Sequence, residues 1–192
     1  MPSTAHHEWV SNRLRSLNAL ETAHTLFGTK GVGLVFLRQQ VVQGYVTQLS
    51  AQFQAFCRDL FSECLDFLVG QIGPAFASPA IRESFEYGRQ LETKNPSPSA
   101  LGTDFGRFGL NLWQTLKAAD PKNADRNKEL ELLNHWRNAI AHQDFKKKEL
   151  AGATTVTLAR AKTWRVVCEE LALELDKVMG DHLQLLLGVS PW

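Results

Sequence analysis

The segment from residue 120 to residue 142 reads DPKNADRNKELELLNHWRNAIAH. Asp120 and Pro121 are typical of a helix N-terminus, where a capping side chain precedes a proline in the first turn. The segment also carries apolar residues at intervals of three and four, the spacing of one face of an α-helix: Leu132, Leu133, Trp136 and Ile140. The segment is therefore predicted to form a helix with one packed face.

The opposite side of this predicted helix is polar. At about 100° per residue, four polar residues fall within roughly 60° of one another: Glu131, His135, Asn138 and His142. Arg137 lies between the two faces, and the small Ala141 leaves room for its guanidinium to extend toward His142. A permanent cation, an amide and an imidazole at the end of one helix suggest phosphodiester chemistry.

The other apolar patterns also have helical spacing, and helices are predicted at about residues 7–26, 34–68, 80–87, 103–118 and 158–187. Gly28, Gly31 and Gly33 are expected to separate the first two helices, and Ile72-Gly73-Pro74 to end the second. Residues 90–102 are predicted to form a polar loop. No strand pattern or internal repeat competes, so the expected fold class is all-α, an antiparallel helical bundle of about four main helices plus short additional helices.

Composition and net charge restrict the kinds of partner that the chain can bind. A length of 192 residues with 44% hydrophobic and 21% charged residues suits one globular domain. A net charge of +1 argues against a broadly polycationic nucleic-acid binder, so any RNA contact requires a local basic patch. Lys146, Lys147 and Lys148 supply such a patch directly after His142. A solvated loop after a helix is the alternative interpretation of this lysine run.

The cysteines indicate a reducing compartment. Cys57, Cys64 and Cys168 are too few for a disulfide framework or a four-thiolate zinc site and are predicted to be buried free thiols.

Glu21 and His24 resemble half of a bundle di-metal site, but no second pair follows, so they are predicted to be helix surface. We therefore expect no metal and no cofactor. Without a secretory pattern or a long apolar run, we expect no membrane partner and a cytoplasmic location.

Arg137, the polar Asn138 and His142 match an Arg-x4-His signature, and in this helical setting the chain resembles the HEPN-domain ribonucleases. The stretch Asn95-Pro96-Ser97-Pro98, followed by the Phe-Gly pairs of residues 105–109, is similar to the linker and short helix of the RiboL-PSP-HEPN subgroup. The resemblance covers about residues 33–188 as a HEPN-like helical domain. Residues 1–32 are then expected to be an N-terminal helical extension.

The resemblance implies a metal-independent endoribonuclease in which two copies of the motif face each other across a homodimer. His142 would take the proton from a ribose 2′-hydroxyl, Arg137 would offset charge on the phosphate, and Asn138 would orient either group. A toxin or defence effector of this kind would bind RNA, a second copy of itself and an antitoxin protein. The alternative is a non-catalytic HEPN-like module for dimerisation or partner binding, in which Arg137 pairs with a carboxylate.

Two further residues are secondary candidates for the site. His135 and Glu131 share the polar face with His142, although a solvated Glu-His pair one turn apart is the favoured interpretation of both. Some HEPN proteins carry a modifiable tyrosine two residues after the histidine, and here Asp144 stands at that position. Regulation by tyrosine modification is therefore not expected.

Overall fold

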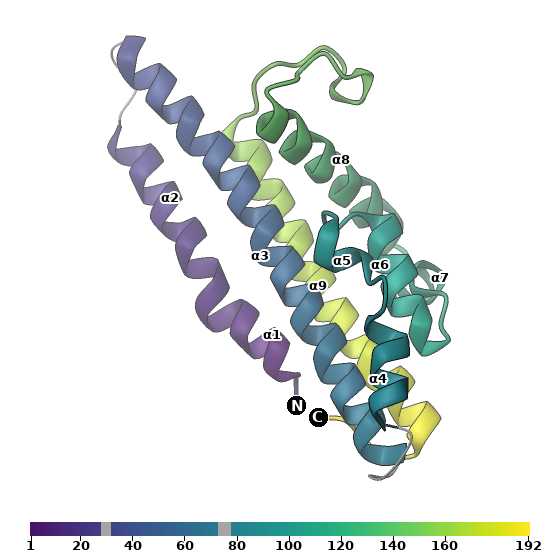
Figure 1. Ribbon diagram of the computed structural model, residues 1–192. Coiled ribbons are helices and arrows are strands. Elements are labelled where there is room, and N and C mark those ends of the chain that lie inside the picture. The colour runs from purple at the N-terminus through teal and green to yellow at the C-terminus, as the bar shows by residue number, and fades with distance from the viewer. Residues whose placement is uncertain (28–31, 73–77) are drawn as a thin grey trace.

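The computed structural model describes residues 1–27, 32–72 and 78–192, and these residues form helices joined by turns and loops (Figure 1). No strand occurs in the described ranges, so the predicted all-α fold is confirmed. The α-helices are α1 (Thr4–Glu8), α2 (Leu14–Leu26), α3 (Val32–Ile72), α4 (Ser78–Glu86), α5 (Gln90–Thr93), α6 (Pro98–Phe105), α7 (Leu112–Ala119), α8 (Asn123–His142) and α9 (Leu158–Leu187). A π-helical turn at Trp9–Arg13 joins α1 to α2, and 3₁₀ turns cover Gly106–Phe108 and Lys148–Leu150.

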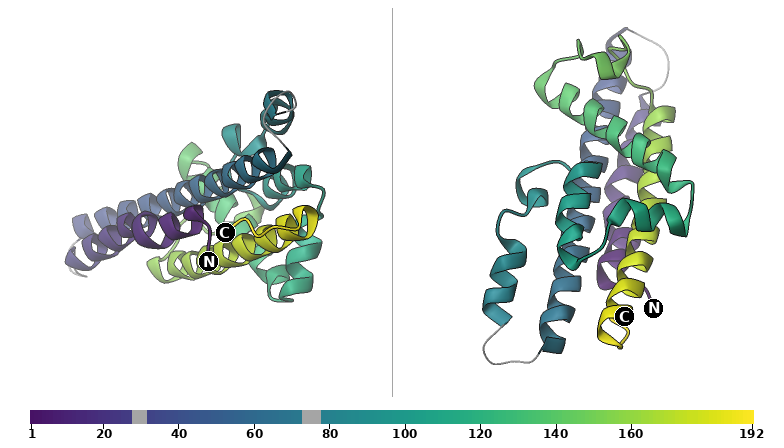
Figure 2. Two further views of the ribbon diagram at one scale, coloured as in Figure 1. Left: turned by 90° about the horizontal axis from the view of Figure 1, so that it is seen from below. Right: turned by 90° about the vertical axis from the view of Figure 1, so that its right-hand side faces the viewer.

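Two long helices, α3 and α9, form the centre of the bundle. Helix α3 contacts α1, α2, α8 and α9, so it is the element on which most of the others pack. Helices α1 and α2 run along one side of α3, while α8 lies on the other side, against both α3 and α9 (Figures 1 and 2). The loop from residue 143 to residue 157 joins α8 to α9 at the end of the bundle where α2 ends and α3 begins (Figure 1).

One continuous hydrophobic core includes the N-terminal helices. Ala5, Trp9 and Leu17 are buried in the same cluster as the apolar residues of α3 and α9. The Trp9 ring lies 5.9 Å from the Phe53 ring of α3 in an edge-on arrangement, which favours aromatic contact. The division of the chain at residue 32 stays a prediction, and this one core extends across it.

The three cysteines are buried and free, as predicted. Burial raises the pKa of each thiol above its ordinary value, because the thiolate would lose its hydration. They therefore act as small apolar side chains of the core.

The first two predicted helices are longer than expected. The first helical stretch begins at Thr4 and passes through the π-helical turn, and α3 extends the predicted 34–68 helix at both ends. Gly33 lies inside α3, so the expectation that it breaks a helix was wrong. The other expected breakers lie outside the described residues: Gly28, Gly31, Gly73 and Pro74.

The region between residues 90 and 119 differs most from the prediction. Residues 90–102 contain α5 and the start of α6 instead of a polar loop. The carboxylate of Asp104 accepts hydrogen bonds from the backbone N–H groups of Gln90 (2.9 Å) and Leu91 (2.8 Å), which satisfies the free donors at the start of α5. Asp104 therefore stabilises a helix distant in sequence and does not start one of its own.

The single helix expected over residues 103–118 is interrupted. Helix α6 and its 3₁₀ extension end at Gly109, whose φ of 84° lies in the left-handed region that favours glycine. Asn111 then starts α7, because its side chain accepts a hydrogen bond from the backbone N–H of Gln114. The apolar spacing alone did not reveal this break, since residues on both sides of Gly109 face the same core.

Candidate functional site

Helix α8 is held by its apolar face. Leu133, Trp136 and Ile140 are buried and Leu132 is partly buried, which confirms the predicted stripe. The Trp136 ring lies 6.5 Å from the Trp164 ring of α9, so the two helices are locked by large side chains. The polar side of α8 is thereby fixed in direction.

The start of α8 differs from the prediction. Asp120 is not the N-cap, because the helix begins at Asn123. Its carboxylate accepts a hydrogen bond from the backbone N–H of Lys122 at 3.0 Å and pairs with Arg126 at 2.7 Å, so it shapes the turn before the helix. The displacement of two to three residues leaves the register of the motif on α8 unchanged.

A polar cavity of about 390 Å³ lies between α8 and the segment that follows α5. We call it the motif cavity. From α8 it is lined by Glu131, Asn134, His135, Arg137 and Asn138, and from the other side by Thr93, Lys94, Asn95 and Ser97. Its volume falls in the range typical of small-molecule sites. Four of the residues expected at the site therefore share one cavity.

Asn138 joins the two walls of the motif cavity. Its side-chain oxygen Oδ1 accepts hydrogen bonds from Nδ2 of Asn95 at 2.6 Å and from Nη1 of Arg137 at 3.3 Å. One turn earlier, the buried Asn134 donates to the carbonyl oxygens of Pro96 (3.1 Å) and Leu130 (2.8 Å). These bonds fasten the segment around residue 95 onto α8, so the wall opposite Arg137 is held in place.

Arg137 is one of the few arginines without an acidic partner. Eight of the eleven arginines lie within 4.0 Å of a carboxylate oxygen. Among the described residues, no carboxylate oxygen comes that close to Arg137. Glu131, which lines the same cavity, instead lies 3.5 Å from the His135 ring, forming the pair one turn apart that was one of the two interpretations. In the part of the chain that the structure describes, the guanidinium charge in the motif cavity therefore has no neutralising carboxylate.

His142 does not line the motif cavity. It is the last residue of α8 and is exposed, and Gln143 in the left-handed conformation (φ 52°) ends the helix directly after it. Nη1 of Arg137 donates to Asn138 and does not reach across Ala141 toward His142. Five residues advance a side chain about 140° around a helix, so the side chains of Arg137 and His142 leave α8 in different directions. Arg137 and His142 of one chain therefore lie near each other along α8 but point in different directions.

The lysine run lies in an anchored loop. Phe145 packs its ring 6.4 Å from that of Trp136, and Leu150 is buried, so apolar side chains hold both ends of the run. Lys146 and Lys148 are exposed between these anchors. The loop thus presents positive charge just beyond His142.

Several residues of the motif cavity were not expected from the sequence. Thr93, Lys94, Asn95 and Ser97 line it, although the sequence marked residues 95–98 only as a linker. The Asn-Pro dipeptide was the available signal, because it favours an irregular turn whose polar groups need partners. The spacing of residues along the sequence could not show which side chains of α8 bond to this turn.

Glu21 was predicted to be helix surface, and this was wrong. Its carboxylate accepts hydrogen bonds from the Tyr45 hydroxyl and from Arg165, both at 2.9 Å, and pairs with Lys162 at 2.7 Å. Among the described residues, no group of three or more His, Cys, Asp or Glu side chains is arranged to hold a metal ion. Glu21 is therefore a structural carboxylate that links α2 to α3 and α9.

Comparison with known proteins gives one match. The sequence profile of the RiboL-PSP-HEPN family matches residues 10–181, which include the motif cavity, His142 and most of α9. No curated protein and no solved structure matches the chain. Within the described ranges, every helix is too short or too polar to span a bilayer.

Proposed function

This chain belongs to the RiboL-PSP-HEPN family, and we propose that it is a metal-independent endoribonuclease whose site combines Arg137 and His142 of two copies. The observation that carries the proposal is the guanidinium of Arg137, which lines a polar cavity without a carboxylate within 4.0 Å among the described residues. A planar, permanently charged guanidinium engages two oxygens of a phosphate. The free charge in this cavity therefore suits an RNA phosphate.

His142 supplies the proton transfer in this proposal. A neutral imidazole takes the proton from the ribose 2′-hydroxyl, and the 2′-oxygen attacks the adjacent phosphorus. The bond from phosphorus to the 5′-oxygen breaks, and that oxygen leaves with a proton from the His142 ring of the second copy. The products are a 2′,3′-cyclic phosphate and a 5′-hydroxyl, so no further reactant is needed.

A homodimer would bring these groups together. Because Arg137 and His142 of one chain point in different directions, a single chain does not present both to one phosphate. A two-fold axis near the exposed end of α8 would place one copy's His142 beside the other copy's motif cavity. Light scattering should therefore show a dimer at micromolar concentration, and a protein that stays monomeric would contradict this arrangement.

Asn138 and the lysine run have supporting roles. Asn138 accepts from Arg137 and Asn95 and would hold the guanidinium toward the phosphate. Lys146, Lys147 and Lys148 would hold flanking phosphates of the RNA, a contribution that salt weakens.

We further propose a toxin or defence role with an antitoxin protein, and growth arrest on expression of the wild type but not of His142→Ala would test it.

A non-catalytic HEPN module is the second candidate. The separation of Arg137 from His142 within one chain favours it, since a binding module needs no such pair. In that case the uncompensated Arg137 would meet a carboxylate of a partner protein. The test is cleavage of single-stranded RNA by the purified protein beside Arg137→Ala and His142→Ala. Cleavage by the wild type alone supports the ribonuclease, whereas equal behaviour of all three proteins supports the module.

A further inference from the structure

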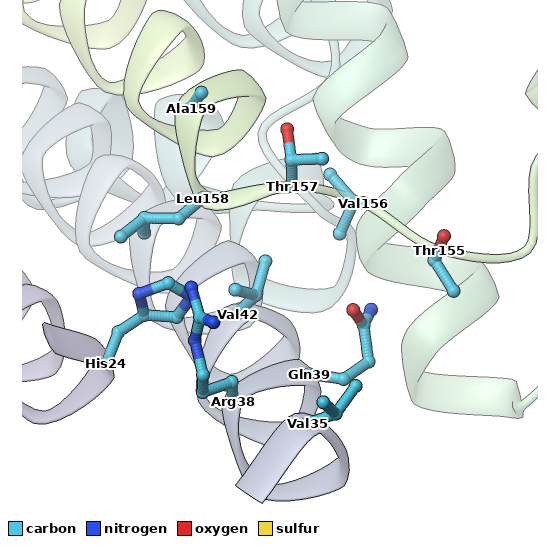
Figure 3. Close-up of a pocket in the computed structure, with 10 residues that line it drawn as sticks. All are labelled: His24, Val35, Arg38, Gln39, Val42, Thr155, Val156, Thr157, Leu158 and Ala159. Atoms are coloured by element: carbon cyan, nitrogen blue, oxygen red, sulfur yellow. The ribbon is translucent and has the colours of Figure 1, made fainter. Parts of the chain in front are cut away.

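A second cavity lies away from the motif cavity, where α2 ends and where α3 and α9 begin. Its volume is about 350 Å³, and its lining includes His24 of α2, Arg38 and Gln39 of α3, residues 155–157 before α9 and Leu158 at the start of α9 (Figure 3). We call it the α9 cavity. It draws on three elements that are distant in sequence, so its shape depends on the folded bundle.

Arg38 extends into the α9 cavity without an acidic partner. Figure 3 shows its side chain beside the His24 ring, directed toward the first turn of α9. Among the described residues, no carboxylate oxygen lies within 4.0 Å of it, and its Nε is shielded from solvent without a hydrogen-bond partner. A donor that is shielded from water and has no acceptor destabilises the fold. An acceptor from outside the chain would remove that destabilisation.

Gln39 supplies a second unused donor in the same cavity. Its Nε2 is likewise shielded from solvent and has no hydrogen-bond partner among the described residues. Two neighbouring residues of α3 thus leave N–H groups unsatisfied along one cavity wall, whereas most buried polar groups in native structures have a hydrogen-bond partner. The shared feature of both groups is that they require an acceptor.

The surroundings also favour negative charge. The pKa of His24 is lowered, first by burial and then by the positive charge of Arg38, so the neutral form of the ring is favoured and the positive charge in this cavity comes from Arg38. The first turn of α9 adds backbone N–H groups, and Thr157 caps only that of Arg160. The side chains of Arg38, Gln39 and His24 and the backbone N–H groups of this first turn can all donate hydrogen bonds.

We propose that the α9 cavity binds a phosphate group, held by the guanidinium of Arg38 with the side-chain amide of Gln39 as a second donor. A guanidinium and an adjacent amide suit the several oxygens of a phosphate, whereas a carboxylate would use fewer of these donors. The volume leaves room for more than the phosphate itself, as a phosphate ester requires.

The phosphate could come from two sources. The α9 cavity lies at the same end of the bundle as the loop that carries Lys146 to Lys148 (Figure 1). An RNA strand reaching past His142 would bring its backbone there, and a free nucleotide or phosphate ion would satisfy the same donors. This inference goes beyond the proposed ribonuclease and does not need cleavage to occur.

The test uses binding on the full chain. Inorganic phosphate is added to ¹⁵N-labelled protein while the Nε–H signal of Arg38 and the side-chain amide signal of Gln39 are followed by NMR. In parallel, a single-stranded RNA with every 2′-hydroxyl methylated, which cannot be cleaved by 2′-oxygen attack, is titrated by fluorescence anisotropy. Arg38→Gln and Gln39→Leu are compared with Arg15→Gln, which removes the same charge from an exposed arginine of α2.

The expected result is a saturable shift of both signals in the wild type and in Arg15→Gln. Arg38→Gln should weaken phosphate binding at least about tenfold, and Gln39→Leu should weaken it less. If RNA affinity and its salt dependence fall in the same variant, the source is the RNA backbone; if RNA affinity stays, the source is a free phosphate or nucleotide. Wild-type signals that do not move, together with equal RNA affinity in Arg38→Gln and Arg15→Gln, would overturn the proposal.

Discussion

Arg165 of α9 and Arg137 of α8 are both partly buried, yet the side chains around them differ in charge. Arg165 lies 2.9 Å from Glu21 and 2.8 Å from Glu169, and it also donates to Asn18. Arg137 donates only to the neutral Asn138 among the described residues and lines a cavity. A neutralised guanidinium ties helices together, while one without a counter-ion beside a cavity is free to bind an anion. The comparison separates structural from functional arginines.

The largest expected effect is on cleavage by Arg137→Ala. We expect RNA cleavage to fall by about 10²- to 10³-fold, the loss typical of removing one group that stabilises charge in the transition state. Stability should change little, because the side chain has no ion pair to lose. Single-turnover kinetics and thermal melting measure the two effects. Near-normal cleavage would remove the distinction between Arg137 and Arg165.

Trp136→Ala changes the residue next to Arg137, which belongs to the packed face of the same helix. Its ring is 6% exposed and packs against Trp164 and Phe145, so its loss should destabilise the fold by about 3 to 5 kcal/mol. Urea unfolding measures this. A stable protein without activity would mean that Trp136 serves the site and not the core.

Glu21→Gln tests the structural role of Arg165 by removing the negative charge of its partner. Burial raises the pKa of Glu21, but hydrogen bonds from Lys162, Tyr45 and Arg165 outweigh it, so the pKa lies below the ordinary value of 4.5. The unfolded chain then binds the proton more readily, and this contribution to stability is complete above pH 4.5 and is lost as pH falls through the lower, folded-state pKa.

At neutral pH we therefore expect Glu21→Gln to lose about 2 kcal/mol, with a smaller loss in acid. Chemical unfolding at several pH values checks this, with cleavage per folded molecule as the control. A loss of stability that is equal at all pH values would show that the carboxylate charge is not what holds Arg165.

Asn95→Ala should have a smaller effect, on the positioning of the site. It removes the 2.6 Å hydrogen bond to Asn138, so Arg137 is held less firmly, and we expect about a tenfold loss of kcat. KM should change less than kcat if Asn95 does not itself bind RNA. Ser97→Ala is unsuitable as a control because Ser97 caps α6, whereas the exposed Lys128→Gln is suitable. A change confined to KM would instead make Asn95 an RNA-binding residue.

The smallest expected effect is that of a chelator. Because imidazole and guanidinium supply the proposed proton transfer and charge stabilisation, EDTA should leave the cleavage rate unchanged. Loss of cleavage in EDTA that magnesium or manganese restores would replace the mechanism.

Periodicity predicted the helices whose packing is simple. The limits of α9 and the packed face of α8 agree with the sequence, because long amphipathic helices are determined by one local pattern. Residues 90–119 were not predicted correctly, since Asp104 caps α5 across the chain and Gly109 breaks an otherwise continuous apolar pattern. Such long-range hydrogen bonds leave no periodic signal.

The candidate site shows the same limit. The sequence indicated Arg137, Asn138 and His142 on one helix, but Asn95 enters the site only through folding. Nor could spacing show that, within the described ranges, no carboxylate lies within 4.0 Å of Arg137 or Arg38 while Arg165 has two. Absence of a counter-ion is a property of the packed chain, and in this protein it marks both cavities that we propose to bind phosphate.

The most direct test of the central claim is cleavage of RNA by wild-type protein and by His142→Ala, with a matched substrate carrying 2′-deoxyribose at the cleaved step. The account predicts that the wild type cuts RNA, leaves a 2′,3′-cyclic phosphate and spares the deoxy substrate, while folded His142→Ala cuts neither. Comparable cleavage of the deoxy substrate, or full activity of His142→Ala, would contradict it.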